Sequence, residues 1–323
     1  MQLMQQQAIA QALAPTASEW GSSRFGEWRR CGKAHDLRYR LRVVARPRPA
    51  DDMGAWEIDS ADYLHLGSLC HSVLRYVQEC AMGIWPDCDP ADWPQVLKAW
   101  EARQADPAAA WEIAGDAATL MTAYWDHYGY ANGGWPEGVE ILGVEVPLSV
   151  RSGVLGPLPY TATADTILRM PGGEIVIADH KTRGRTLPPD RQRYVSGLRT
   201  RPQFAGLSWL VQQGGFAPDA APPAVWVNYL IKPTKTLGPR FERLFTRMDQ
   251  RTLDGWAQAQ TATAYAMADI SSQRDPVADW SQCAPEIGPR CWAFEYCHGS
   301  DESRERHYRT LDSAAPAAGE QNA

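Results

Sequence analysis

The sequence lacks long apolar runs and a recognisable targeting segment. No uninterrupted apolar stretch in its 323 residues approaches the roughly 20 residues that a membrane-spanning helix needs. The first residues, MQLMQQQAIAQALAPTASEW, carry no charge ahead of their mildly apolar part, unlike a secretory signal peptide. We therefore expect a cytoplasmic protein with no membrane partner.

An overall positive charge is also absent, as is a P-loop. The net charge of −6 argues against a surface that binds nucleic acid everywhere. No G-x-x-x-x-G-K-(S/T) segment occurs, so the chain contains no motor of the P-loop type. However, half of the 32 Lys and Arg residues lie in residues 24–48 and 181–201, where acids are few. This distribution is typical of one basic groove on an acidic surface, although two solvated faces would give the same pattern.

Cysteine is sparse and odd in number, with seven residues in the chain. In a cytosolic protein we do not expect such cysteines to form disulfides. Cys283, Cys291 and Cys297 lie within fifteen residues amid Pro and Gly, and Cys31 lies in a basic segment near the other end. Cysteines grouped in this way indicate metal or cluster ligation. The remaining cysteines, on or near an early helix, are expected to be unligated: Cys70, Cys80 and Cys88.

Apolar periodicity and turn residues predict an α/β fold with a mixed central sheet. The expected helices cover about residues 61–82, 91–128 with a break near 106–107, 202–213 and 249–270. The expected strands cover about residues 143–150, 161–170, 174–180 and 224–231. This order, in which helices precede a strand meander with a crossover helix, is typical of an α/β domain with a helical insertion.

Composition divides the chain into one domain and two polar ends. Residues 1–17 are rich in Ala and Gln and are expected to be disordered, and residues 299–323 form a tail that is mostly disordered. Residues 18–298 are expected to form a single domain. Within it we place a helical insertion at about 61–130, a core at about 140–246, and a C-terminal helix with a cysteine cluster at 249–298.

The segment TATADTILRM-PGG-EIVIADHKT predicts a hairpin that brings two carboxylates together. Its turn centres the pairing on Gly172, seven residues after Asp165 and seven before Asp179. The aspartates are then cross-strand partners on one face, to which Lys181 also points. Facing carboxylates repel and are costly to bury. Either Lys181 compensates alone, or the aspartates bind a divalent metal such as magnesium or manganese.

Asp165 and, at the end of the next strand, Asp179-His180-Lys181 resemble the D…(D/E)-x-K signature of PD-(D/E)XK nucleases. The resemblance implies a restriction-endonuclease-like core that hydrolyses phosphodiesters with magnesium or manganese. It makes Asp165 and Asp179 catalytic metal ligands, and the backbone carbonyl of His180 would complete the metal shell. Lys181 would position or deprotonate the attacking water and stabilise charge on the phosphate.

Two further segments resemble the RecB-like members of that family. HLGSLCHSVL matches their G-x-x-x-H motif with Gly67 and His71, one helical turn apart, where glycine leaves room for the imidazole or for another backbone. The resemblance makes His71 a metal ligand, whereas on the residues alone a satisfied core histidine is commoner. Gln203 resembles the first position of the Q-x-x-x-Y motif and would line the catalytic site, or else face solvent. Leu207 stands where that motif has tyrosine, so the DNA contact of that tyrosine is not carried over.

The cysteines extend the resemblance to the iron–sulfur branch of RecB-like nucleases, which includes AddB-type and CRISPR-associated members. In that branch one N-terminal and three C-terminal cysteines hold a 4Fe–4S cluster, which needs four thiolates. The matching residues are Cys31, Cys283, Cys291 and Cys297, although the gap between Cys283 and Cys291 is wider than in many members. Such a cluster would staple the two ends of the chain around the nuclease core. Zinc is the alternative, since four thiolates bind it equally well.

The resemblance implies a DNA exonuclease that acts at single-stranded ends, in recombination, repair or phage DNA processing. Because the chain carries no helicase motor, unwinding would need a partner, such as a helicase, a recombinase or an adaptation complex. End trimming in CRISPR adaptation and a non-catalytic DNA-binding or scaffold role stay open as alternatives. A non-nuclease α/β protein that matches these motifs by chance would bind no divalent metal at Asp165 and Asp179.

Two sets of side chains would add to this site. The basic stretch near Gln203 is expected to guide the DNA backbone. Its arginines are Arg183, Arg185, Arg191, Arg193, Arg199 and Arg201. Glu145, in the strand-like GVEVPL, is a further candidate carboxylate, although glutamates in strands are usually exposed partners.

Overall fold

The structure is a computed structural model that describes residues 2–14, 25, 43–45, 55–104, 106–184, 186–216, 221–234, 236–271, 297 and 308–310. The chain divides into two compact units. The first contains Met1–Thr16, Asp59–Leu148 and Thr163–Leu253, and the second contains Ala17–Ile58, Ser149–Ala162 and Asp254–Ala323. Residues 18–298, which we expected to form a single domain, are distributed over both units. Among the described helices, none combines the length and apolar content that crossing a membrane requires.

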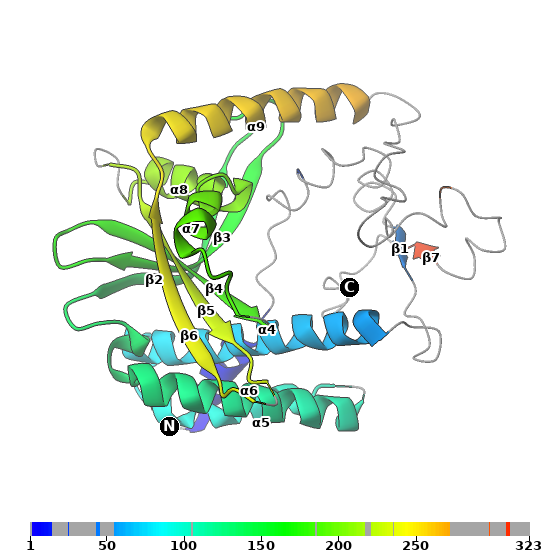
Figure 1. The fold of residues 1–323 in the computed structure, drawn as a ribbon, viewed down its shortest axis with the longest axis vertical. Coiled ribbons are helices and arrows are strands. Elements are labelled where there is room, and N and C mark those ends of the chain that lie inside the picture. The colour runs from blue at the N-terminus through cyan, green and yellow to red at the C-terminus, as the bar shows by residue number, and fades with distance from the viewer. Residues whose placement is uncertain are drawn as a thin grey trace. The chain divides into compact units, whose positions relative to one another are not determined.

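A five-stranded mixed sheet runs through the structure in the order β2-β3-β4-β5-β6 (Figure 1). Its strands are β2 (Glu140–Val150), β3 (Tyr160–Arg169), β4 (Ile175–Arg183), β5 (Ala224–Ile231) and β6 (Arg240–Arg247). Strands β4 and β5 are parallel, and the pairs β3–β4 and β5–β6 are antiparallel. A parallel pair needs a crossover, which α7 (Arg191–Leu198) and α8 (Pro202–Gln213) supply. The predicted mixed α/β architecture is therefore confirmed.

The β3–β4 hairpin has the predicted register. Thr166 pairs with Ala178 and Arg169 with Ile175, so the pairing is centred on Gly172. The turn closes through a hydrogen bond from the Gly173 N–H to the Met170 carbonyl at 2.8 Å, and Gly173 has a φ of 83°. Only glycine adopts such a backbone readily. Continued by one residue, the register places Asp165 opposite Asp179.

A layer of helices covers one side of the sheet and contains α4 (Ala55–Ala81), α5 (Pro94–Glu101) and α6 (Pro107–Tyr128) (Figure 1). On α4 the buried Leu66, Leu69, Val73 and Tyr76 recur at helical spacing, and they share a core cluster with Leu230 of β5. Helix α4 begins before residue 61, where we expected it to start. The predicted break near 106–107 is confirmed, because the Asp106 side chain caps α6 by accepting the N–H groups of Ala108 and Ala109. Short 3₁₀ segments, Pro90–Asp92 and Ala131–Gly134, flank these helices.

The prediction that residues 1–17 are disordered was wrong for helix α1 (Gln2–Ala12). Ala8 and Ala12, one turn apart, are 0% and 3% exposed and belong to the core of the helical layer. The Gln5 amide also donates to the Asp92 carboxylate at 2.7 Å. Composition missed this helix because small alanines bury little apolar surface, yet they let a helix approach its neighbour closely.

The expectation of no disulfides was also wrong, because Cys80 and Cys88 form one. Their Cα atoms are 5.5 Å apart, within the range that a disulfide requires. Cys80 lies in the last turn of α4, and Gly83, with a φ of 71°, lies in the turn that follows. This reversal of the chain brings Cys88 back beside the helix end.

In the second unit, aromatic contacts and one short strand pair join distant segments. Tyr160 contacts Phe25 and Trp256 edge to face, with ring centroids 5.5 and 5.2 Å apart. Trp256 belongs to α9 (Gln250–Ser271), which matches the predicted last helix. Strand β1 (Val43–Ala45) pairs antiparallel with β7 (Tyr308–Thr310), so part of the expected C-terminal tail has regular structure.

Candidate active site

The face of the β3–β4 hairpin that carries Asp179 and Lys181 is buried and charged. The Asp179 side chain is 2% exposed, and its Oδ1 accepts hydrogen bonds from Lys181 Nζ at 3.0 Å and Gln203 Nε2 at 2.9 Å. Lys181 Nζ also lies 2.9 Å from Oδ2, but without the alignment of a hydrogen bond. Among the described residues, no donor satisfies this buried Oδ2. This oxygen lies beside the Lys181 ammonium but accepts no hydrogen bond within the described part of the chain, so it can serve as a ligand to an additional cation.

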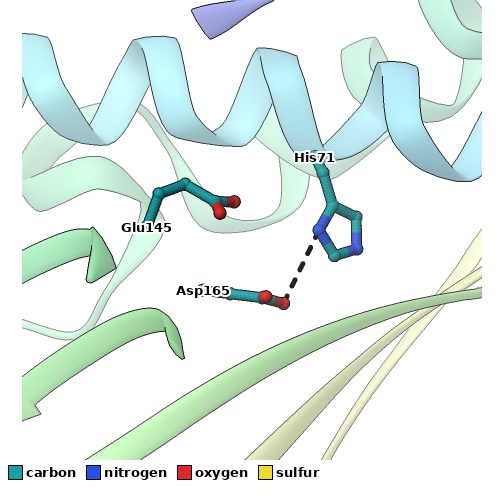
Figure 2. A group of neighbouring side chains, drawn as sticks. All are labelled: His71, Glu145 and Asp165. Atoms are coloured by element: carbon teal, nitrogen blue, oxygen red, sulfur yellow. Dashed lines mark ion pairs between the residues drawn. The ribbon is translucent and has the colours of Figure 1, made fainter. Parts of the chain in front are cut away.

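Asp165 and His71 approach each other beside this pair (Figure 2). Asp165 Oδ2 accepts the backbone N–H of His180 at 2.7 Å and lies 3.6 Å from His71 Nδ1. The other ring nitrogen of His71, Nε2, lies 2.9 Å from the His180 carbonyl oxygen. His71 thus stands between a carboxylate and a carbonyl. The structure therefore brings the predicted residues of the early helix and of the hairpin together.

Glu145 of β2 joins this group. Ligand atoms of His71, Glu145 and Asp165 all lie within 4.8 Å of one another, and Figure 2 shows the three side chains pointing toward one another. Glu145 has a φ of 49°, which is unusual for a residue other than glycine inside a strand. Such a backbone costs about 1–3 kcal/mol, and strained positions of this kind cluster at functional sites. The sequence raised Glu145 only weakly, because a left-handed φ leaves no signal in a segment such as GVEVPL.

These donors suit magnesium or manganese. Carboxylate oxygens and one imidazole nitrogen are ligands that such ions accept, and carboxylate and carbonyl oxygens are the donors that magnesium prefers. The close group contains His71, Asp165 and Glu145, whereas the Asp179 carboxylate beside it is engaged by Lys181 and Gln203. Oδ2 of Asp179, which accepts no hydrogen bond from the described residues, is an additional atom that could bind the metal. The residues therefore fit the divalent metal that the sequence predicted, with Glu145 added to the expected set.

Burial and charge move the pKa values of the two aspartates in opposite directions. Burial raises the pKa of Asp179 to about 6, although Lys181 opposes the rise. Burial would also raise the pKa of Asp165, but the charges of His71 and Lys181 hold it below its ordinary value. Burial acts to lower the pKa of Lys181, but both carboxylates outweigh it and raise that pKa, so the ammonium stays protonated. In the metal-free protein Lys181 is thus a counter-ion of Asp179.

Gly67 allows α4 to lie close to β4. A Cβ atom at Gly67 would be 2.9 Å from Thr182 Oγ1, which is closer than real Cβ contacts. We expected the free space to serve the imidazole or another backbone, but the neighbour is a side chain of β4. His71 lies one turn further along α4 and reaches the His180 carbonyl. The glycine of the motif therefore sets the approach of the helix that carries the histidine.

His180 lies on the opposite face of β4 and belongs to a buried polar network. Its Nδ1 is 2.9 Å from Asn228 Nδ2, and Asn228 also donates to the Tyr124 hydroxyl at 2.9 Å. Arg243 donates to the same hydroxyl at 3.0 Å and packs over the Trp135 ring, which stacks on His180. Burial lowers the pKa of His180 to about 3, so the ring is neutral and Nδ1 accepts from Asn228. Sequence reasoning missed this network, although an Asn inside the apolar strand AVWVNYLI was a signal.

The arginines of the basic stretch separate into different environments. Arg191 forms an ion pair with Glu242 at 2.8 Å, and Arg199 donates to the Thr246 hydroxyl at 3.3 Å. Arg193 is exposed on α7, whereas Arg183 and Arg201 both reach the Tyr194 hydroxyl. Arg185 lies outside the described residues. Leu207, at the tyrosine position of the Q-x-x-x-Y motif, is 3% exposed in the core.

Residues 19–298 match the PD-(D/E)XK nuclease superfamily. The chain belongs to this superfamily. A crystal structure from Eubacterium rectale described as a "putative exonuclease" is similar at a TM-score of 0.43 and 12% identity, over 87% of this chain and 93% of that one. No match to this chain is found among curated proteins. Nucleases of this superfamily use divalent metals, in keeping with the donor group at His71, Glu145 and Asp165.

Proposed function

We propose that this chain is a metal-dependent DNA exonuclease that hydrolyses phosphodiester bonds at single-stranded ends. One observation carries the proposal: the ligand atoms of His71, Glu145 and Asp165 gather within 4.8 Å beside the Lys181–Asp179 pair. Membership of the superfamily supports phosphodiester hydrolysis, and the family resemblance of the motifs supports action at single-stranded ends. We expect magnesium or manganese to be the metal.

Each residue has a distinct part in this proposal. His71, Asp165 and Glu145 would hold the metal, with Oδ2 of Asp179 and the His180 carbonyl nearby as further ligand atoms. When bound, the metal would polarise the phosphodiester and lower the pKa of a water molecule.

Lys181 is protonated and held by Asp179, so its ammonium can orient the attacking water and neutralise charge that develops on the phosphate. Gln203 shares Asp179 Oδ1 with Lys181 and thereby fixes the carboxylate that orients the lysine.

The test is cleavage of end-labelled single- and double-stranded DNA, with magnesium or with manganese. Lys181→Ala should lower the rate by about 10²–10⁴-fold, as expected for loss of a positioned catalytic group. Lys98→Ala, which removes an exposed lysine on α5, is the matched control and should cleave like the wild type. The product ladder would reveal the direction of degradation. If the folded wild type degrades neither substrate with either metal, the stand-alone enzyme is excluded, and a binding or partner-dependent subunit becomes the better account.

We also propose a 4Fe–4S cluster on Cys31, Cys283, Cys291 and Cys297, with zinc as the rival. Of these, only Cys297 lies within the described residues, where it is half-buried. The pairing of β1 with β7 supports the proposal, because these strands follow the two cysteine-bearing segments in the chain. Iron and acid-labile sulfide in anaerobically purified protein, at about four of each per chain, would support the cluster. Stoichiometric zinc without iron would identify the rival instead.

A further inference from the structure

Beyond Lys181, the catalytic face of the sheet carries two tyrosines that meet two arginines. Tyr229 is the β5 partner of Lys181 in the sheet, and its hydroxyl lies 2.9 Å from the hydroxyl of Tyr194 on α7. Arg183, at the end of β4, donates to the Tyr194 hydroxyl at 3.1 Å, and Arg201, just before α8, donates to it at 3.4 Å. Two guanidinium groups from separate elements thus converge on one hydroxyl.

Within the described part of the chain, no carboxylate is ion-paired with either of these two positive charges, those of Arg183 and Arg201. The nearby Arg191, by contrast, is paired with Glu242. Each of the two guanidinium groups also lies 5.7 Å from the centre of the Tyr194 ring, so the ring holds both in place. Positive groups that share one neighbour repel each other, and an anion between them would relieve the repulsion.

The chemistry of the group selects the anion. A guanidinium presents a planar fork of N–H donors that matches the oxygens of a phosphate, and the Tyr194 hydroxyl, which accepts from both guanidinium groups, orients the two forks. Arg183 follows Lys181 by two residues in the same strand, about 6.6 Å along it and on the same face. That separation is comparable to the spacing of successive phosphates along an extended nucleic-acid strand. No base-reading geometry is needed, because phosphate contacts position a strand without reading its sequence.

We propose that Arg183 and Arg201, oriented by the Tyr194 hydroxyl, bind a backbone phosphate of the DNA strand adjacent to the phosphate that is hydrolysed. The position of this phosphate next to the hydrolysed one rests on the proposed function, which places the hydrolysed phosphate at Lys181. The binding of a DNA phosphate at these residues does not depend on hydrolysis. Tyr229, buried below, fixes the Tyr194 hydroxyl so that it faces the two arginines.

The first test measures binding without cleavage. Fluorescence anisotropy with a labelled single-stranded oligonucleotide, in EDTA, compares the full-length wild type with the Arg183→Ala/Arg201→Ala double variant. We expect the double variant to bind about tenfold more weakly, because it loses charge-assisted hydrogen bonds to one phosphate. The slope of log K against log salt should decrease in magnitude by about 0.7, as expected for one phosphate contact on a single strand. The control Arg103→Ala removes an exposed arginine just after α5, outside the basic stretch, and should bind like the wild type.

The decisive experiment identifies which phosphate of the DNA these residues contact. A set of oligonucleotides, each with one neutral methylphosphonate linkage at a different position, is bound to the wild type and to the double variant. One position should weaken binding to the wild type and have no effect on the double variant, which is the non-additivity expected of a direct contact. If every neutral linkage weakens DNA binding by the wild type and by the double variant equally, the proposed phosphate site is wrong.

Two further results separate this proposal from the proposed function. If the wild type cleaves no DNA but the methylphosphonate coupling is found, the phosphate site stands and hydrolysis fails. If the wild type cleaves DNA and no coupling is found, hydrolysis stands and the phosphate site fails. Should the double variant not fold, Tyr194→Phe keeps the ring and removes only the hydroxyl. It should reduce both the affinity and the coupling by about threefold, within the range of a single hydrogen bond, and full retention of the coupling would overturn the proposal.

Discussion

Asp179 and His180 are neighbours in β4 and are both 2% exposed, but their side chains lie on opposite faces of the sheet. On one face, His180 contacts Asn228 and stacks on Trp135, and its ring is neutral. On the other face, Asp179 has a charged partner, Lys181, and one oxygen, Oδ2, that accepts no hydrogen bond from the described residues although the Lys181 ammonium lies 2.9 Å away. The comparison shows that burial alone does not mark a ligand-binding group. A buried group with an atom that accepts no hydrogen bond is a better indication of a ligand-binding site.

The two faces also differ in how positive charge is held. Arg243 lies behind the sheet, 3.6 Å from the centre of the Tyr128 ring, and donates to the Gly134 carbonyl at 2.7 Å. Its Nε and Nη2 groups together donate to three acceptors of the protein, Asn228, Tyr124 and Gly134. Arg183 and Arg201, on the catalytic face, share one tyrosine hydroxyl and have no described carboxylate. Arg243 therefore stabilises the fold, whereas Arg183 and Arg201 are available to bind a ligand.

The largest effect is expected from removing the charge of Asp179 on the catalytic face, the face that carries Asp179 and Lys181. Asp179→Asn should lower the rate of DNA cleavage by about 10³-fold, because it removes the carboxylate that positions Lys181. The same change should raise the melting temperature at neutral pH. The raised pKa of Asp179 shows that burial disfavours its charged form, and asparagine removes that cost. Cleavage assays and thermal unfolding on one preparation measure both effects. If the variant loses both stability and activity, Asp179 has a structural role and not a catalytic one.

The second-largest effect is expected from a change on the rear face of the sheet, the face that carries His180 and Asn228. Asn228→Leu should lower the free energy of unfolding by about 2–3 kcal/mol, because the buried His180 ring and Tyr124 hydroxyl lose their shared partner. Cleavage per folded molecule should change by less than about threefold, since a rear-face residue contributes no interaction to the transition state. Denaturant unfolding and cleavage well below the melting temperature separate the two quantities. Loss of cleavage in a stable Asn228→Leu protein would show that the rear network belongs to the site.

A smaller effect sharpens the role of Glu145. Glu145→Gln should weaken manganese binding by about tenfold, which corresponds to 1.4 kcal/mol. Glu145→Gly should weaken it as much and yet raise the free energy of unfolding by about 1 kcal/mol, since glycine adopts a positive φ without strain. Calorimetric titration and urea unfolding measure the pair. If glycine destabilises the protein, the left-handed backbone at this position is not a source of strain.

The smallest effect concerns the approach of α4 to β4. Gly67→Ala should change the free energy of unfolding by less than about 1 kcal/mol, because the gain in helix propensity offsets the close contact with Thr182 Oγ1. Thr182→Ala removes that oxygen, so the double variant should be more stable than the sum of the single effects predicts. Urea unfolding of all four proteins gives the coupling. Strict additivity would mean that Thr182 does not limit the approach of the helix.

The elements that could be predicted from the sequence carry local signals. The PGG turn sets the hairpin register, Asp106-Pro107 begins α6, and Pro202 begins α8. Helix α7 was missed although Asp190, which caps it by accepting the Arg193 N–H, was a readable signal.

The rest of the site depends on contacts that the sequence does not encode locally. Glu145 reaches His71 and Asp165 through a backbone angle that no pattern reveals. Asn228 and Arg243 meet His180 only because β4, β5 and β6 are adjacent in the sheet. The convergence of Arg183 and Arg201 on Tyr194 likewise depends on where α7 packs.

Calorimetric titration of manganese into wild type, Asp165→Asn and Asn228→Leu tests most directly whether the carboxylates beside Lys181 bind a metal. We expect saturable binding to the wild type, binding to Asn228→Leu with similar affinity, and loss of most of the affinity in Asp165→Asn. If the wild type binds no manganese, or if Asp165→Asn binds it as the wild type does, the carboxylates of this face are not a metal site.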